Sequence, residues 1–209
     1  MDYTVNPTLS AATTATATAA ESLAGAAKDS ASATHLVDLP FTPLGGSPAF
    51  EPAALERFLG GRHIAVVSYL RKDGRPNQAP LWYLYRDGTL WFNVETGSAK
   101  HHALRRDGRV CVTIQDERPP YRAVIVEGTV ELIEPGDPSL PHELAVRFFG
   151  RLGASSYERM VAEAGSAGGV TVRLHPTEVK GFDNTRMIGR ALLVFARLRD
   201  RLPVPRRWL

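Results

Sequence analysis

The stretch from residue 78 to residue 112 constrains the fold most, because turn residues divide it into short segments with different patterns. Residues 81–86 read Leu-Trp-Tyr-Leu-Tyr-Arg, and residues 89–94 are again rich in aromatic and β-branched side chains, which favours strands. Gly88 lies between them and tolerates the positive φ of a hairpin turn. The stretch therefore predicts a hairpin, followed by a loop, a short helix and a strand over residues 109–115.

The loop after this hairpin carries a possible anion site. Ser98 stands where an N-cap is expected, so the unpaired backbone N–H groups of the following helix lie next to it. Hydroxyls from Thr96 and Ser98 and the ammonium of Lys100 would add further donors, and this combination suits a phosphate. An ordinary capped helix that binds nothing explains the same spacing.

The remaining chain predicts a mainly β fold with peripheral helices. A parallel sheet would need a crossover helix after nearly every strand, and the sequence has too few helices for that. We therefore expect an antiparallel barrel of six or more strands, with a bulge or close approach at Gly128. The patterns predict helices over 51–59, 140–149 and 155–164, and strands over 63–70, 121–133, 170–174 and 177–182.

Composition shifts divide the chain into three parts. Residues 1–34 are rich in Ala, Thr and Ser, which predicts a flexible extension, or a start site placed too early. Residues 35–185 form the expected barrel domain, in which 36–48 is Pro- and Gly-rich connecting chain that could lie over the barrel. Residues 186–209 form a basic amphipathic tail, which we interpret as a docked terminal helix with a solvated basic face. Contact of this tail with an acidic membrane or with nucleic acid is the alternative.

Composition also excludes several classes of protein. A hydrophobic content of 44% in 209 residues is enough for a real core, and the net charge of +3 does not require a nucleic-acid partner. Cys111 is the single cysteine, so neither an intrachain disulfide nor a cysteine metal cluster is expected. No apolar run reaches the roughly 18 residues of a membrane span. No secretion signal is recognisable, so we expect the cytoplasm.

Familiar catalytic motifs are missing. The sequence has no zinc-protease helix, no nucleophile elbow and neither of the common glycine-rich phosphate loops. His101 and His102 are adjacent, so on a helix they point about 100° apart and cannot easily hold one metal, and we interpret both as surface histidines. No metal site and no catalytic residue is predicted.

Several motifs in order resemble the pyridoxamine 5′-phosphate oxidase-like superfamily of split β-barrel flavoproteins. They are Pro-Leu-Trp-Tyr at 80–83, Thr-Gly-Ser-Ala-Lys at 96–100, Arg-Arg-Asp-Gly-Arg at 105–109 and Val-Cys-Val-Thr-Ile at 110–114. Within the superfamily the chain most resembles the branch that uses the deazaflavin coenzyme F420. The resemblance is good over residues 63–130, weaker over 169–183 and absent from the first fifty. It implies a split β-barrel and an oxidoreductase whose cofactor carries the hydride.

The resemblance also implies a cofactor site between two subunits of a homodimer. One strand would line the ring system, the next would reach the ribityl chain, and the loop after it would hold the phosphate, with Lys100 as the charge partner. Gln115 would contact the partner's ring. The implied binding residues are Gln78, Ala79, Pro80, Leu81, Trp82, Asn93, Val94, Glu95, Thr96, Gly97, Ser98, Ala99, Lys100 and Gln115. For Pro80 and Trp82, an edge strand with a packed aromatic is the simpler alternative.

Three functions fit this interpretation. The first is an F420-dependent oxidoreductase that acts on a small organic substrate. The second is an FMN-dependent oxidase or reductase of the same fold, and the third is a non-catalytic protein that binds flavin or haem. F420 adds an acidic tail, and Lys100, Arg75, Arg105 and Arg106 could supply a basic exit for it, although the solvated face of a helix also explains Arg105 and Arg106. Together with the family likeness, this favours F420 over FMN.

Overall fold

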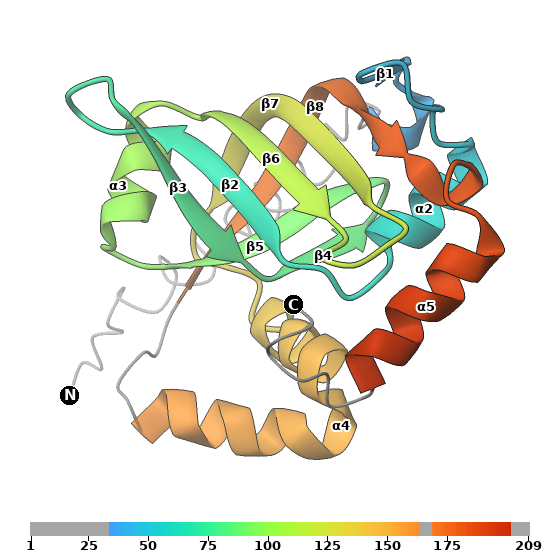
Figure 1. Cartoon of the computed structure of the whole chain (residues 1–209). Coiled ribbons are helices and arrows are strands. Elements are labelled where there is room, and N and C mark those ends of the chain that lie inside the picture. The colour runs from blue at the N-terminus through green and yellow to red at the C-terminus, as the bar shows by residue number, and fades with distance from the viewer. Residues whose placement is uncertain (1–33, 164–168, 202–209) are drawn as a thin grey trace, which may run out of the picture. The chain divides into compact units, whose positions relative to one another are not determined.

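The computed structural model describes residues 34–163 and 169–201, so most of the expected extension and the last eight residues of the tail lie outside the described part. The described strands form one eight-stranded sheet (Figure 1). They are β1 (Phe41–Pro43), β2 (Ala65–Leu70), β3 (Pro76–Leu81), β4 (Tyr83–Arg86), β5 (Thr89–Glu95), β6 (Arg109–Gln115), β7 (Arg122–Ile133) and β8 (Gly169–Asp183).

The strand order explains why the barrel is split. Neighbouring strands follow the order β3-β2-β6-β7-β8-β5-β4, and every pairing along this path is antiparallel. The two edge strands, β3 and β4, follow each other in the chain and are separated by Trp82 alone. The sheet therefore curls until its edges meet at Trp82 without pairing there. The predicted mainly β, split-barrel fold is confirmed.

The segment over 36–48 is more than connecting chain. It contains a short 3-10 helix, η2 (Leu36–Asp38), and β1, which pairs in parallel with β8. Phe41 lies opposite Val179, and its ring meets that of Phe50 at a centroid distance of 5.6 Å. Leu36 is fully buried. These apolar side chains tie the segment to the sheet, and the Pro- and Gly-rich composition concealed this.

Two glycines have the roles that their positions predict. In the β4–β5 hairpin, Asp87 and Gly88 both have positive φ, of 53° and 71°, as a two-residue type I′ turn requires. The pairing of β7 with β8 shifts register between Glu127 and Gly128, which is the predicted bulge. A Cβ on Gly128 would lie 2.2 Å from the carbonyl oxygen of His175, so only glycine allows the two strands to approach this closely.

Helices lie around the sheet (Figure 1). They are α2 (Pro52–Leu59), α3 (Ala99–Arg106), α4 (Leu140–Glu163), the 3-10 helix η3 (Asn184–Arg186) and α5 (Arg190–Arg201). In α4 the backbone leaves helical geometry at Gly150, with φ 73° and ψ 171°, as expected for two helices with a break between them. The second helix resumes directly after Gly150 rather than at residue 155.

Tyr83 links the barrel interior to α2, and Arg86 holds the start of α4 outside the barrel. Tyr83 is fully buried, and its hydroxyl donates a hydrogen bond of 2.9 Å to the carbonyl oxygen of Leu59 in α2. Burial raises the pKa of Tyr83 to about 12. Outside the barrel, Arg86 lies 3.1 Å from Asp137 and 3.3 Å from Glu143, which fixes the start of α4. A second apolar cluster lies where α4 meets the sheet and consists of Leu84, Trp91, Leu140 and Leu144.

The predicted docking of the terminal helix leaves much of the apolar surface of α5 uncovered by the described chain. Three of its large apolar side chains, Leu192, Phe195 and Leu198, are 62%, 72% and 49% exposed. Among the described residues, no helix is both long enough and apolar enough to cross a membrane.

Candidate cofactor site

The loop between β5 and α3 has the shape of an anion-binding turn. Gly97 has a φ of 76°, and this conformation turns the chain into α3. Ser98 is the N-cap, as predicted: its hydroxyl accepts a 3.2 Å hydrogen bond from the backbone N–H of His101. The N–H groups of Ala99 and Lys100 have no acceptor within the described residues. Two backbone donors at a helix N-terminus thus remain available to a ligand.

His101 holds this loop in place, and its interpretation as a surface residue is wrong. The residue is only 4% exposed. Its Nδ1 accepts a 3.0 Å hydrogen bond from the N–H of Gly97, so Nε2 carries the proton that is directed at Glu134, 3.0 Å away. The register of α3 turns His101 inward and leaves His102 exposed. Sequence reasoning missed this because adjacent histidines look alike until the buried face of the helix is known.

Lys100 is a half-buried ammonium at the start of the same helix. It forms no hydrogen bond or ion pair with any other described residue. Burial lowers the pKa of Lys100, and the Glu95 carboxylate opposes that effect. A cation that has lost part of its hydration and has no direct partner is stabilised by a bound anion. Lys100 therefore has the chemistry of a phosphate ligand.

Four of the predicted residues line one pocket. Pro80, Leu81 and Trp82 at the end of β3, together with Asn93 of β5, border a cavity of about 300 Å³. Its other wall comes from α4, through Pro141, Leu144, Tyr157 and Val161. This volume lies at the lower end of the range for ligand pockets. The contribution of α4 could not be found in the sequence, because the helix lies about 60 residues away along the chain.

Trp82 links the sheet to α4. Its ring stacks on Phe148 at a centroid distance of 4.6 Å and an interplanar angle of 14°, and it lies 5.0 Å from the ring of Tyr157. Trp82 therefore serves two roles at once: it packs against α4, as the simpler interpretation holds, and it forms part of the pocket wall.

The other predicted site residues are more scattered. Val94 is 2% exposed and belongs to the barrel core, so its side chain cannot touch a cofactor in this conformation. Ala79 is half-buried against the same core. Gln78 donates a 3.1 Å hydrogen bond to the hydroxyl of Ser68 on β2. Glu95, Thr96, Gly97 and Ala99 are exposed around the loop.

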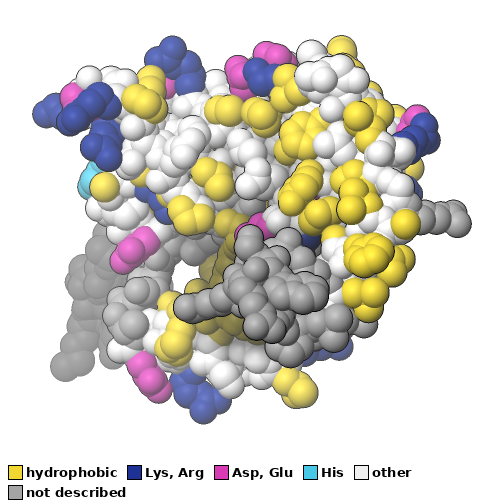
Figure 2. Space-filling view, in the orientation of Figure 1, with side chains coloured by type: hydrophobic (Ala, Val, Ile, Leu, Met, Phe, Trp, Pro, Cys, Tyr) yellow, Lys and Arg dark blue, Asp and Glu magenta, His cyan; other side chains and the backbone are white. Residues whose placement is uncertain are grey.

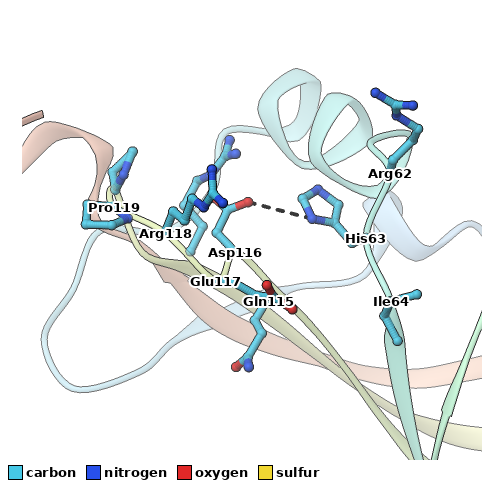
Figure 3. Close-up of a pocket in the computed structure, with 10 residues that line it drawn as sticks. Arg62, His63, Ile64, Gln115, Asp116, Glu117, Arg118 and Pro119 are labelled. Atoms are coloured by element: carbon cyan, nitrogen blue, oxygen red, sulfur yellow. Dashed lines mark hydrogen bonds and ion pairs between the residues drawn. The ribbon is translucent and has the colours of Figure 1, made fainter. Parts of the chain in front are cut away.

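Gln115 lies elsewhere, at a second pocket of about 450 Å³ between the entry to β2 and the β6–β7 loop (Figure 3). Asp116 is an acid that lines this second pocket. Its Oδ1 lies 3.6 Å from His63 Nδ1, and its Oδ2 lies 2.6 Å from Arg122 Nε. Burial lowers the pKa of His63, and the effect is opposed by Asp116 and reinforced by Arg122 and Arg147. Within one chain, Gln115 is thus not brought to the pocket beside Trp82.

Other reactive groups are sparse in the described part of the chain. No cluster of three or more His, Cys, Asp or Glu side chains is arranged there to hold a metal ion. Cys111 is half-buried, and burial raises the pKa of its thiol, which disfavours the reactive thiolate.

Comparison with known proteins identifies the family. The family model described as pyridoxamine 5′-phosphate oxidase matches residues 52–182, which is more than half of the chain. The chain belongs to this family. The matched region begins with α2 and ends in β8, so it contains both pockets and the phosphate-type loop. No match was found among curated proteins.

Several solved structures are similar to this chain. The conserved hypothetical protein Rv2991 from Mycobacterium tuberculosis is 22% identical, with a TM-score of 0.57, over 70% of this chain and 97% of that chain. An F420 reductase is 20% identical, with a TM-score of 0.44, over 59% and 94%. A FAD-binding protein from Mesorhizobium loti is 22% identical, with a TM-score of 0.44, over 63% and 94%. The TM-score with Rv2991 shows a common fold, and identities this low leave the cofactor of this family member open.

Proposed function

We propose that this protein is an oxidoreductase that binds the deazaflavin coenzyme F420 and transfers a hydride between it and a small organic substrate. The observation that carries the proposal is the half-buried Lys100 ammonium, which has no direct partner among the described residues and lies beside two free backbone N–H donors. Such a group is stabilised by phosphate, and β5 leads directly from Asn93 in the pocket wall to this loop.

The residues of the chain divide into three binding roles. Lys100 Nζ, with the N–H groups of Ala99 and Lys100, would hold the phosphate, and the Thr96 hydroxyl would add a donor. Asn93 and Glu95 would contact the ribityl chain. Pro80, Leu81 and Trp82 would flank the ring system, where apolar walls exclude water and restrict the approach of the substrate.

The site needs little acid–base chemistry for this reaction. When bound, the deazaflavin supplies the hydride, so the protein chiefly binds, orients and shields it. Among the described residues that line the pocket beside Trp82, Tyr157 alone carries a hydroxyl. No residue is assigned as catalytic.

F420 is preferred to FMN on the sequence resemblance, since both cofactors share the phosphate that the loop would hold. The basic exit expected for the acidic tail of F420 is reduced in the structure. Arg75 pairs with Asp73 at 2.6 Å, and Arg106 donates to the Leu70 carbonyl oxygen at 2.7 Å. Arg105 is 68% exposed and lies 3.9 Å from Glu134, so it is the arginine best placed to meet an anionic tail.

Fluorescence titration of the full chain with F420, and separately with FMN, tests the proposal. We expect F420 to bind and FMN not to bind, and hydride transfer is then assayed with F420H2. Binding of FMN alone would assign the protein to the flavin-dependent oxidases or reductases. Binding of either cofactor without turnover under any reductant would indicate a carrier, and binding of neither would refute the assignment of the loop.

The Lys100→Ala variant tests the phosphate role directly. We expect a loss of about 1.5–3 kcal/mol in binding free energy, the typical contribution of a hydrogen bond to a charged group, with an unchanged melting temperature. Lys72→Ala, in the exposed turn between β2 and β3, is the matched control and should bind as the wild type does. Wild-type affinity in Lys100→Ala would remove Lys100 from the site.

A further inference from the structure

Helix α5 presents an apolar surface that the described chain does not cover. Leu192, Phe195 and Leu198 follow one another at intervals of three, and Val194 is exposed as well, at 53%. Leu193 and Ala196 are only half-exposed, so they mark the side that is turned towards the protein. Figure 2 shows hydrophobic side chains gathered on the side of the molecule where α5 lies. We call Leu192, Val194, Phe195 and Leu198 the α5 apolar surface.

The segment that carries this surface is strongly basic. Between residues 186 and 209 the sequence has one acid, Asp200, against seven arginines: Arg186, Arg190, Arg197, Arg199, Arg201, Arg206 and Arg207. Four of these arginines, Arg190, Arg197, Arg199 and Arg201, belong to α5 itself. An apolar surface on a strongly basic helix is the pattern of helices that lie in a membrane interface.

Charge and hydrophobicity distinguish between the molecules that could cover the α5 apolar surface. Two copies of α5 placed together would bring eight arginines and only two aspartates into one region, and repulsion between like charges disfavours that pairing. A nucleic acid would match the arginines but would leave the apolar side chains in water. A surface of anionic lipid satisfies both features, because acyl chains receive Leu192 and Phe195 while the headgroups attract the arginines.

We propose that α5 binds the surface of membranes that contain anionic lipids and lies parallel to their plane. Its twelve residues span about 18 Å, which is shorter than the roughly 30 Å hydrocarbon core, so the helix rests on the bilayer and does not cross it. This inference is independent of the cofactor, since none of the residues in the α5 apolar surface lines the pocket beside Trp82.

Sedimentation of the full chain with lipid vesicles tests the proposal. We expect vesicles of phosphatidylglycerol and phosphatidylcholine to carry the protein into the pellet, and vesicles of phosphatidylcholine alone to bind it at least ~10-fold more weakly. Binding should also weaken as salt is raised, because added ions screen the arginines. Failure of the wild-type chain to bind the anionic vesicles would overturn the proposal.

A double variant, Leu192→Glu with Phe195→Glu, separates lipid binding from other uses of the surface. We expect it to lose about 100-fold or more in anionic-lipid binding, because two apolar anchors are replaced by repelled carboxylates. Both positions are well exposed, so thermal unfolding should stay unchanged. Leu152→Glu is the matched control: Leu152 lies on α4, is 95% exposed and should leave lipid binding intact.

Two further outcomes would reject the proposal in favour of another occupant. If light scattering shows that the double variant halves the mass of the protein in solution while vesicle binding is absent throughout, the α5 apolar surface joins two copies. If duplex DNA binds and anionic vesicles do not, the basic segment recognises nucleic acid. Unchanged vesicle binding by the double variant would show that α5 is not the contact.

Discussion

Individual residues around the phosphate-type loop divide into those that would touch a ligand and those that position the loop. Lys100 belongs to the first group, and His101 belongs to the second because its ring accepts from Gly97 N–H and donates to Glu134. The chain thus uses a buried imidazole as a brace between the loop and the end of β7. The exposed His102 beside it has no such role.

The variant His101→Ala tests this brace. Leaving the N–H of Gly97 without its acceptor, and the Glu134 carboxylate with Arg105 alone, should cost about 1–3 kcal/mol of folding stability and loosen the loop. We expect faster hydrogen exchange at Gly97 and weaker cofactor binding, measured by titration. His102→Ala should match the wild type in both assays. Protection of the Gly97 amide in His101→Ala would contradict the assignment.

His63 makes stability depend on pH. Because burial holds its pKa below the ordinary value of 6.5, the unfolded chain binds a proton more readily than the folded one. Protonation of His63 therefore does not reduce the folding stability above pH 6.5, and the stability decreases as the pH falls below that value. Urea unfolding of the wild type should show the fall, and the fall should be smaller in His63→Asn. Identical pH profiles for the two proteins would contradict the prediction.

At the level of elements, the long antiparallel pair of β7 and β8 contains a backbone contact that only glycine allows. The bulge at Gly128 brings the backbone of β7 against that of His175 and Pro176 in β8, and it fits no side chain. The extra residue of the bulge is Thr177 in β8, which has no partner opposite it in β7.

Gly128→Ala should separate these strands locally. The new methyl group would meet backbone atoms, which cannot move as a flexible side chain would, so we expect a destabilisation of about 1–3 kcal/mol. Thermal unfolding measures the effect. Thr129→Ala, at the exposed neighbouring position, should change stability by about 0.5 kcal/mol or less. Equal melting temperatures for the two variants would show that the strands adjust freely.

At the level of the whole molecule, the predicted site residues of one chain lie at two separate pockets. The pocket beside Trp82 and the pocket beside Gln115 have separate linings. The family resemblance assigns both to one cofactor site, which requires a second chain to supply the missing part. We therefore propose that the protein is a homodimer with the cofactor at the subunit interface.

Light scattering in solution tests this assembly. We expect a mass of about twice the 22.8 kDa of one chain, and we expect Gln115→Ala to weaken cofactor binding without altering that mass. A monomer that binds the cofactor with full affinity would show that one chain completes the site alone, and Gln115 would then have no part in it.

What the sequence determined by itself is local. The Asp87-Gly88 turn, the Ser98 N-cap and the bulge at Gly128 are signalled by residues that are close in the chain, and all three are found as predicted. The strand predicted over 81–86 is divided at Trp82 between β3 and β4. The order and types of the main strands follow from them, and with the family resemblance they were enough to predict the split barrel.

Tertiary structure alone decided which of these residues share an environment. The burial of His101, the core position of Val94 and the wall that α4 adds beside Trp82 depend on packing between segments many residues apart. The pairing of β1 with β8 and the exposed side of α5 belong to the same class. A local pattern shows that a residue is apolar or charged, but only the folded chain selects the surface it meets, because burial is a property of the whole packing.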